Sequence, residues 1–187
     1  METFTEPIDF IVNAHYDRQR RESLDKLDLG AIDAPIVDIV RGLSRLPYCF
    51  TLQSCYGHFL YPGQRDPLNI APLPILPELT QIEYRIAYLA LCIQESETGR
   101  DLVNELRQIP DIDPGTIQFG CATWFWEQQV NSYVLQVEPE RYKNQDRALI
   151  PYQEALHVQR TRARFWELLR DLVEQCSGVL SCRCRLC

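Results

Sequence analysis

A short stretch, Ser54-Cys55-Tyr56-Gly57-His58, gathers the side chains of this chain that are best suited to chemistry. It holds a hydroxyl, a thiol, a phenol and one of only three histidines. A Cys three residues before a His fits a nucleophile pair, two metal ligands or two walls of a ligand pocket. Gly57 permits a left-handed or close-approach backbone there. A tight turn with a buried thiol is the structural alternative; we favour a functional site in which Cys55 and His58 are the catalytic residues.

A second group of this kind is a positive stripe on the last predicted helix. His157, Arg160 and Arg164 follow one another at intervals of three and four residues and therefore share a helix face. Arginines bind phosphate or carboxylate through paired hydrogen bonds, so the stripe predicts an anion-binding surface. A solvated face paired with Glu167 and Asp171 explains the same pattern.

Aromatic residues form a third group, Trp124-Phe125-Trp126, which we expect beside Tyr133. Such rings stack on a base or an adenine ring, and they also fill protein cores. The tryptophan that points away from the core is a predicted ligand contact, and we assign this role to Trp124.

The C-terminus carries Cys182, Cys184 and Cys187, a spacing that resembles half of a metal site. A structural zinc site needs four ligands, and the nearest further cysteine in the sequence is Cys176. We therefore expect residues 179–187 to form an oxidisable, Cys-rich tail and predict no metal site there.

The composition limits the class of protein. A chain of 187 residues, 45% hydrophobic, predicts one globular domain, which we place at residues 1–178. The net charge of -7 argues against a general nucleic-acid binder. That charge is uneven, because residues 1–140 hold 10 basic and 21 acidic side chains, whereas residues 141–187 hold 9 and 5. Without a signal-like N-terminus or a membrane-length apolar run, the chain is expected to be cytoplasmic, with no membrane partner and with reduced cysteines.

The elements that would position these side chains alternate between helices and strands. Spacing and capping residues predict helices at 9–27, from the N-cap Asp33 to Leu46, from Ser96 to Pro110, and at 152–176 with Gly178 as C-cap. β-Branched and aromatic runs predict strands at Tyr48–Gln53, 82–93, Thr116–Trp126 and Ser132–Glu138. Residues 60–77 hold five prolines and predict a long loop, either a flap over the Gly57-His58 turn or a surface crossing.

This order of elements predicts an α/β or α+β fold in which helices cover a mostly four-stranded mixed sheet. Open sheets of this kind bind ligands at the carboxyl ends of strands. Ser54 to His58 directly follow the predicted strand Tyr48–Gln53, so the fold places them where a ligand would bind.

With these residues in place, the first third of the chain resembles the wybutosine-synthesis methyltransferase family. The resemblance covers the segment from Phe10 to Leu27, the step Gly30-Ala31-Ile32-Asp33, the following helix and the strand that ends at His58. The family's strand ends in Thr-x-x-Ser-Cys-Ser-Gly-Arg, and Thr51, Ser54, Cys55 and Gly57 match that pattern. A weaker match continues at Trp124-Phe125 and at Tyr133 to Val137.

The third-step enzyme of that family methylates a tricyclic guanosine derivative in phenylalanine tRNA, using S-adenosylmethionine. The resemblance therefore implies the same fold, S-adenosylmethionine as cofactor, and a modified tRNA nucleoside or a smaller analogue as substrate. The pocket would be lined by the ligand-binding residues Thr51, Ser54, Tyr56, Gly57, Trp124 and Gln136.

The chain departs from the family pattern at the site. His58 stands in place of Arg, Tyr56 in place of Ser and Gln136 in place of His. The net charge of -7 also disfavours tRNA as a partner, although a small-molecule ligand is unaffected. Two alternatives to the methyltransferase stay open: a Cys/His-based or metal-dependent small-molecule enzyme, and a non-catalytic binding or scaffold protein on the same fold.

Overall fold

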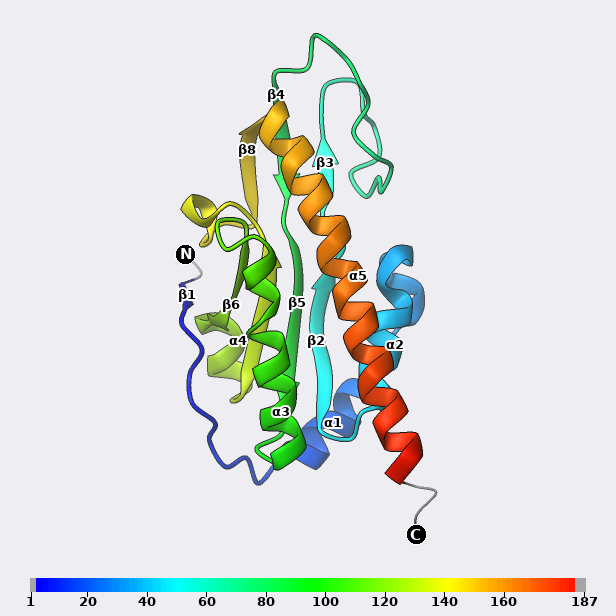
Figure 1. The fold of residues 1–187 in the computed structure, drawn as a ribbon, viewed down its shortest axis with the longest axis vertical. Helices are drawn as coiled ribbons and strands as arrows, with labels where there is room; N and C mark the ends of the chain where they lie inside the picture. The colour runs from blue at the N-terminus through cyan, green and yellow to red at the C-terminus, as the bar shows by residue number, and fades with distance from the viewer. Residues whose placement is uncertain (1–2, 184–187) are drawn as a thin grey trace.

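The computed structural model describes residues 3–183, with side chains up to Gly178. Within this range the strands form two antiparallel sheets, one ordered β1-β6-β7-β5-β2 and one ordered β3-β4-β8 (Figure 1). The strands are β1 Phe4–Thr5, β2 Cys49–Cys55, β3 His58–Leu60, β4 Gln81–Arg85, β5 Ala87–Ile93, β6 Ile117–Ala122, β7 Ser132–Val137 and β8 Arg147–Pro151. A mixture of helices and sheet is confirmed, whereas a single four-stranded mixed sheet is wrong.

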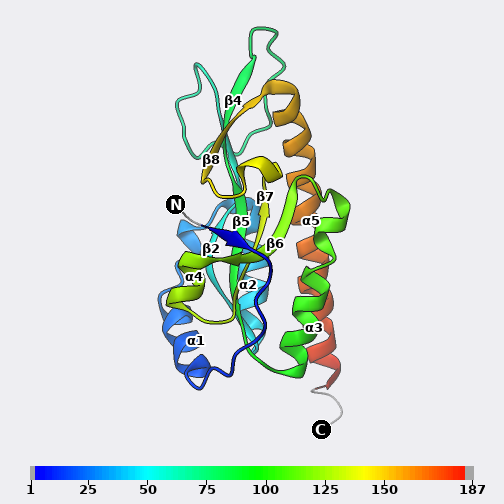
Figure 2. The same cartoon turned by 90° about the vertical axis from the view of Figure 1, so that its left-hand side faces the viewer.

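Five α-helices cover the larger sheet in the described part of the chain. They are α1 Tyr16–Asp25, α2 Val37–Arg45, α3 Glu97–Leu106, α4 Thr123–Gln128 and α5 Tyr152–Arg183. Helices α3 and α5 lie on one face with α2 beside α5, whereas α1 and α4 lie on the other face (Figures 1 and 2). None of the helices in this range is both long enough and apolar enough to cross a bilayer.

One long β-ribbon runs through both sheets. Strand β2 continues after Tyr56 and Gly57 into β3, and β4 continues after Ile86 into β5. Cys55 faces Tyr88 and His58 faces Arg85, so both halves of the ribbon keep the same register. The predicted strand 82–93 is thereby confirmed, with a break at Ile86, and the predicted loop is the connection between β3 and β4.

A third strand pair breaks at the same level. Strand β7 pairs with β5, and β8 pairs with β4, but the 3-10 turn Glu140–Tyr142 and its flanking residues separate them. The sheets therefore meet at a junction where three chain segments leave regular pairing: Tyr56-Gly57, Ile86 and residues 138–146. Strand β8 was not predicted, because its five residues give too short an alternating pattern ahead of helix α5.

Strand alternation divides the core between the two faces of the larger sheet. Leu135 and Val137 of β7 share the main core with Phe165 and Leu169 of α5. Val134 points to the other face and packs in a smaller cluster with Phe125 of α4. Because both faces of β5 and β7 are covered, these strands are almost continuously apolar, as their sequences indicate.

The predicted helix 9–27 is wrong over its first half. Helix α1 begins only at Tyr16, and the preceding segment binds to the end of β7. The Asn131 amide bonds both the N–H and the carbonyl of Ile11, at 2.8 and 2.7 Å, and the Tyr133 hydroxyl donates to the carbonyl of Ile8 at 3.0 Å. These long-range bonds replace the helical bonds that the local apolar spacing favoured.

The predicted strand end at Trp124-Phe125-Trp126 is also wrong. Strand β6 ends at Ala122, and Thr123 opens the short helix α4. The Thr123 side chain donates to the carbonyl of Thr3 at 3.0 Å, which holds the start of α4 against the N-terminal segment. A helix of only six residues, three of them aromatic, has no periodicity long enough to be distinguished from a strand.

Gly178 does not end the last helix, because α5 continues to Arg183. The predicted C-cap is therefore wrong, and the first half of the expected tail is helical. Residues 184–187, with Cys184 and Cys187, lie outside the described residues. By contrast, Ser96 caps α3 as predicted, with its hydroxyl oxygen accepting from the Gly99 amide at 3.1 Å.

Candidate functional site

The Tyr56-Gly57 step carries the chain from one sheet to the other. Gly57 has a φ of +93°, a conformation that side chains disfavour. A Cβ at Gly57 would lie 2.8 Å from the Cβ of Ala87 and 3.0 Å from its backbone nitrogen. Glycine is therefore required both for the turn and for close approach to the neighbouring strand.

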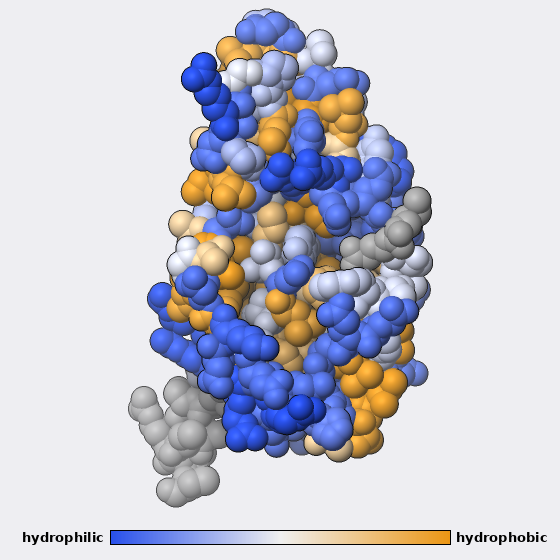
Figure 3. All heavy atoms as spheres, turned by 180° about the vertical axis from the view of Figure 1, so that it is seen from behind, coloured by the Kyte–Doolittle hydropathy of each residue, from blue (hydrophilic) through white to orange (hydrophobic). Residues whose placement is uncertain are grey.

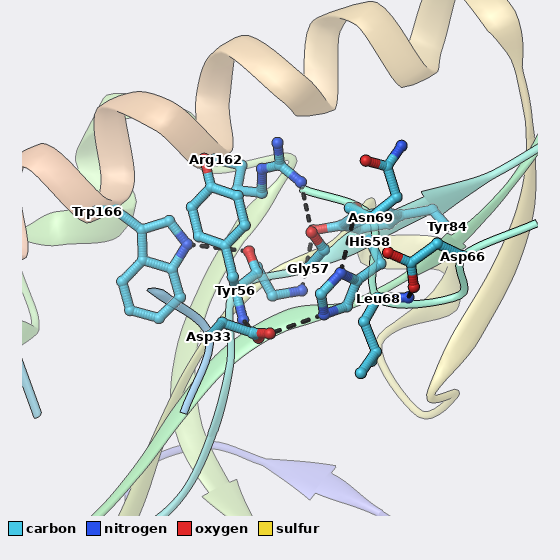
Figure 4. A network of polar contacts seen from close by, with 11 residues as sticks. Asp33, Tyr56, Gly57, His58, Asp66, Leu68, Asn69, Tyr84, Arg162 and Trp166 are labelled. Carbon is cyan, nitrogen blue, oxygen red and sulfur yellow. Dashed lines mark hydrogen bonds and ion pairs between the residues drawn. The ribbon is translucent and has the colours of Figure 1, made fainter. Parts of the chain in front are cut away.

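Helix α5 holds this turn through two residues one helical turn apart. The Trp166 indole donates to the carbonyl of Tyr56 at 3.1 Å, and the Arg162 guanidinium donates to the carbonyl of Gly57 (Figure 4). Arg162 is buried, with its Cζ 4.2 Å from the ring centroid of Tyr56 and 4.8 Å from that of Phe59. Two successive carbonyls of the turn are thereby satisfied inside the protein.

His58, the first residue of β3, is buried against Asp33 (Figure 4). Its Nε2 lies 3.3 Å from Asp33 Oδ2, and its Nδ1 lies 3.4 Å from the carbonyl oxygen of Asn69. Because a carbonyl only accepts, Nδ1 carries the proton of that contact. Hydrogen bonding with Asp33 and then with Cys55 raises the pKa of His58 to about 10.

The sequence had suggested that Asp33 caps helix α2. The Asp33 side chain makes no capping hydrogen bond, and it belongs to this site instead. Its Oδ2 accepts from the Tyr56 amide at 2.8 Å as well as facing His58. Burial acts to raise the pKa of Asp33, but the hydrogen bonds from His58 and Tyr56 outweigh it and hold the pKa below its ordinary value. A carboxylate, an imidazole and the Cys55 thiol therefore meet at the turn.

The donor atoms of Asp33, Cys55 and His58 all lie within 4.8 Å of one another. Such a group can act as a nucleophile with a neighbouring base and its orienting acid, or it can ligate a metal ion. The structure thus brings the two predicted catalytic residues together and adds a third that sequence reasoning had given another role.

A cavity of about 810 Å³ lies at the junction of the two sheets, beside Cys55. Its walls include Cys55 of β2, Tyr88 of β5, Gln136 of β7 and Trp124 of α4. It also has charged walls of both signs, which include Arg85, Lys143, Arg147, Glu127 and Asp146. The face of the molecule away from α3 and α5 shows apolar and hydrophilic side chains close together (Figure 3).

The cavity brings together three of the predicted site residues, Cys55, Trp124 and Gln136. Gln136 is held by bonds from its side-chain nitrogen to the Gln118 side chain and the Lys143 carbonyl, both at 3.2 Å. Trp124 is 49% exposed. The other predicted residues of the turn lie outside the cavity wall, namely Thr51, Ser54, Tyr56, Gly57 and His58.

Sequence reasoning missed several residues of the cavity, among them Tyr88, Arg85 and Arg147. Tyr88 sits directly between Cys55 and Gln136 on neighbouring strands, so correct pairing of β2, β5 and β7 would have identified it. Arg85 and Arg147 also face each other, across the β4–β8 pair. Without β8 this relationship could not be predicted.

The residues of the predicted anion stripe lie apart from this site. His157 Nε2 is 2.7 Å from Asp113 Oδ2, and Arg164 is paired with Glu167 at 2.5 Å. Arg160 is exposed and has no ion pair within the described residues. Two of the three predicted anion ligands thus already have carboxylate partners.

Glu138, at the end of β7, is fully buried. Both of its carboxylate oxygens lack a hydrogen-bond partner among the described residues. Burial, and then the charge of Asp146, raises the pKa of Glu138 to about 9. The side chain is therefore a neutral acid at pH 7, at the start of the segment that supplies Lys143, Asp146 and the first residue of β8, Arg147, to the cavity.

Comparison with known proteins leaves the family open. No protein-family model matches the chain, and no curated protein matches it in sequence. The solved structure of the PH1069 protein from Pyrococcus horikoshii is similar, with a TM-score of 0.51 and 13% sequence identity. The match covers 85% of this chain and 96% of PH1069. At this identity the likeness concerns the fold alone.

Proposed function

We propose that this protein binds S-adenosylmethionine in the cavity beside Cys55 and acts as a methyltransferase on a modified nucleoside. The observation that carries the proposal is the shared cavity wall of Cys55, Trp124 and Gln136. These residues lie in three separate segments that resemble the wybutosine-synthesis methyltransferases, and the fold brings them to one place. If the resemblance reflected only the composition of strands, these three residues would not be expected to share one cavity wall.

The cavity has the size and chemistry that such a cofactor needs. Small-molecule sites typically enclose about 300–1,000 Å³, and this cavity encloses about 810 Å³. Trp124 and Tyr88 offer aromatic surface for an adenine ring. Arginines suit the carboxylate of the methionine part, and acidic groups suit its amino group and the ribose hydroxyls; Arg85, Arg147, Glu127 and Asp146 provide both kinds.

For the substrate we propose a modified tRNA nucleoside or a smaller analogue, and the charge favours the smaller one. Residues 1–140, which supply most of the cavity, carry a net charge of -11, from 10 basic and 21 acidic side chains. Phosphate-backbone binding depends on clustered Lys and Arg. The basic residues at the cavity, Arg85, Lys143 and Arg147, are few, and each already has a carboxylate partner, Glu83 for both arginines and Glu140 for Lys143.

Isothermal titration calorimetry with S-adenosylmethionine and S-adenosylhomocysteine tests cofactor binding directly. We expect saturable binding that weakens about tenfold or more in Trp124→Ala, since one aromatic stacking contact contributes about 1–3 kcal/mol. Leu149→Ala removes another exposed apolar side chain, one outside the cavity wall, and should leave the affinity unchanged. Absence of saturable binding at millimolar concentrations of both ligands would refute the proposal.

A second candidate function is a Cys/His-based or metal-dependent small-molecule enzyme that uses the same cavity. The close approach of Cys55, His58 and Asp33 favours this function, because Cys55 belongs both to this group and to the cavity wall. Metal analysis and an alkylation profile of Cys55 against pH test this function, and a metal-free protein whose Cys55 reacts like free cysteine would rule it out. The non-catalytic scaffold has no comparable observation in its favour.

A further inference from the structure

We propose that Asp33, Cys55 and His58 form a binding site for a single zinc ion. This inference is independent of cofactor binding in the cavity. The three side chains come from the loop before α2, from the end of β2 and from the start of β3, and their donor atoms lie within 4.8 Å of one another. Among the described residues, this is the group of His, Cys, Asp or Glu side chains that brings three possible metal-ligand atoms this close to one another.

The spacing of the donor atoms fits a tetrahedral ion. Zinc–nitrogen and zinc–oxygen bonds of about 2.0–2.1 Å place two such ligands roughly 3.3 Å apart at the tetrahedral angle. The observed distance between His58 Nε2 and Asp33 Oδ2 is 3.3 Å. A thiolate ligand lies roughly 3.6 Å from the other two donors in such a site. The Cys55 sulfur lies at most 4.8 Å from the other two donor atoms, so a side-chain adjustment of about one ångström would bring it to this distance.

The imidazole is oriented as a metal ligand would be. The Nδ1–H of His58 points to the carbonyl of Asn69, so Nε2 is the nitrogen that faces Asp33. A carboxylate oxygen and an unprotonated Nε2 repel each other unless a proton or a metal ion lies between them. Metal-ligating histidines usually donate their other N–H to a carbonyl or carboxylate, as His58 does here.

The carboxylate is held in the same manner. The Tyr56 amide donates to Asp33 Oδ2 at 2.8 Å and fixes the orientation of this ligand. The buried Arg162 is directed to the Gly57 carbonyl and the Tyr56 ring and does not form an ion pair with Asp33. The His58 contact is thus the ion pair of Asp33 within the described residues.

The donor set selects the metal. Thiolate and imidazole ligands favour zinc, whereas magnesium and calcium prefer all-oxygen sites. Binding of zinc releases two protons to solvent, one from the Cys55 thiol and one from His58 Nε2, where it lies between the imidazole and Asp33, and leaves a site with three protein ligands. Sites with three protein ligands keep a fourth position for water or substrate. Because Cys55 also lines the cavity, a zinc ion here would lie at its edge.

Metal binding can be measured on the full chain with the C-terminal thiols removed. Cys182, Cys184 and Cys187 could bind zinc themselves, so the starting protein carries C182S, C184S and C187S. Equilibration with zinc, dialysis and elemental analysis should then give one zinc per chain. Cobalt in place of zinc should give a thiolate-to-cobalt charge-transfer band together with the visible spectrum of a tetrahedral site.

Single substitutions assign the ligands. Cys55→Ser should abolish the charge-transfer band, and His58→Gln or Asp33→Asn should weaken zinc binding by more than the roughly 10–100-fold typical of outer contacts. The second His–Asp pair, His157 with Asp113 at 2.7 Å, has no thiol, so His157→Gln is the matched control and should bind zinc normally.

Two outcomes would overturn the proposal. The first is a protein that retains no zinc and shows no cobalt charge-transfer band, which would leave a proton between His58 and Asp33. The second is a Cys55→Ser variant that keeps the full zinc content. Neither outcome depends on S-adenosylmethionine, so failure of the zinc site and failure of the proposed cofactor binding are distinguishable.

Discussion

The guanidinium of Arg162 lies over the ring of Tyr56, with the Arg162 Cζ atom 4.2 Å from the ring centroid. The two residues belong to α5 and to the turn between β2 and β3, which are far apart in the sequence. The same guanidinium donates to the Gly57 carbonyl. The backbone that positions Cys55 and His58 therefore depends on a buried cation from the last helix.

Arg162→Met should destabilise the protein by about 2–4 kcal/mol, because it removes a charge-assisted hydrogen bond and a desolvated cation–π contact. Denaturant unfolding followed by circular dichroism measures the change. The control is Arg160→Met on the same helix, where the side chain is exposed and the cost should be within about 0.5 kcal/mol. Equal effects of the two substitutions would contradict the role of Arg162.

Much of the secondary structure was predictable, because it follows from local patterns. The strand Cys49–Cys55 and the Ser96-capped helix α3 lie close to where apolar spacing and capping residues place them. The pairing of strands was not predictable in the same way. It depends on contacts such as that between Tyr88 and Gln136, which no local pattern specifies.

The same reasoning explains how far the site could be predicted. The Cys55 to His58 turn was recognisable by its residue types, but Asp33 looked like a helix cap because an Asp before Ala-Pro is typical of one. Its actual partners, the Tyr56 amide and His58, are 23 and 25 residues away in the sequence. Arg162 was not among the predicted site residues, yet it is 3% exposed and faces inward.

Gly57→Ala should cost several kcal/mol of stability, from two separable causes. One is the positive φ of +93°, and the other is the contact that a Cβ would make with Ala87 at 2.8 Å. Gly63→Ala separates them, because Gly63 has a φ of +88° but no atom within 4 Å of the position that an added Cβ would occupy. Its cost should be about 1 kcal/mol.

Urea unfolding of both glycine variants measures these costs. A Gly57→Ala protein as stable as Gly63→Ala would show that the neighbouring strand yields at no cost. That result would remove the close approach of Ala87 from the requirements of the turn.

Glu138 should make the protein less stable as the pH rises. Its pKa is about 9 when folded, against an ordinary value of 4.5, so the folded chain holds a proton that the unfolded chain releases between these values. Stability from this group is therefore complete below about pH 4.5 and is lost as the pH rises toward 9. Glu138→Gln should flatten this dependence and stabilise the protein at pH 8 by roughly 2–4 kcal/mol.

Thermal and urea unfolding between pH 5 and about pH 9 provide the measurement. Glu140→Gln, at an exposed position two residues later, is the control and should leave the pH dependence unchanged. A steeper loss of stability with pH in Glu138→Gln than in the wild type would refute the assignment of Glu138 as a neutral buried acid.

Cys55 should be alkylated more readily than the buried cysteines Cys49, Cys92 and Cys121. It lines the cavity and is partly exposed, whereas Cys49, Cys92 and Cys121 are buried. Burial raises the pKa of Cys92 to about 12 and that of Cys121 to about 11, so few of these thiols form the reactive thiolate near neutral pH.

Iodoacetamide treatment of the chelator-treated protein, followed by peptide mass spectrometry, should therefore show Cys55 modified at least about tenfold faster than Cys92. Cys92 serves as the internal control, since it lies in the same sheet but behind covering side chains. Equal rates for the two residues would mean that reagents do not reach Cys55 through the cavity, and the cavity could not then deliver a substrate to this thiol.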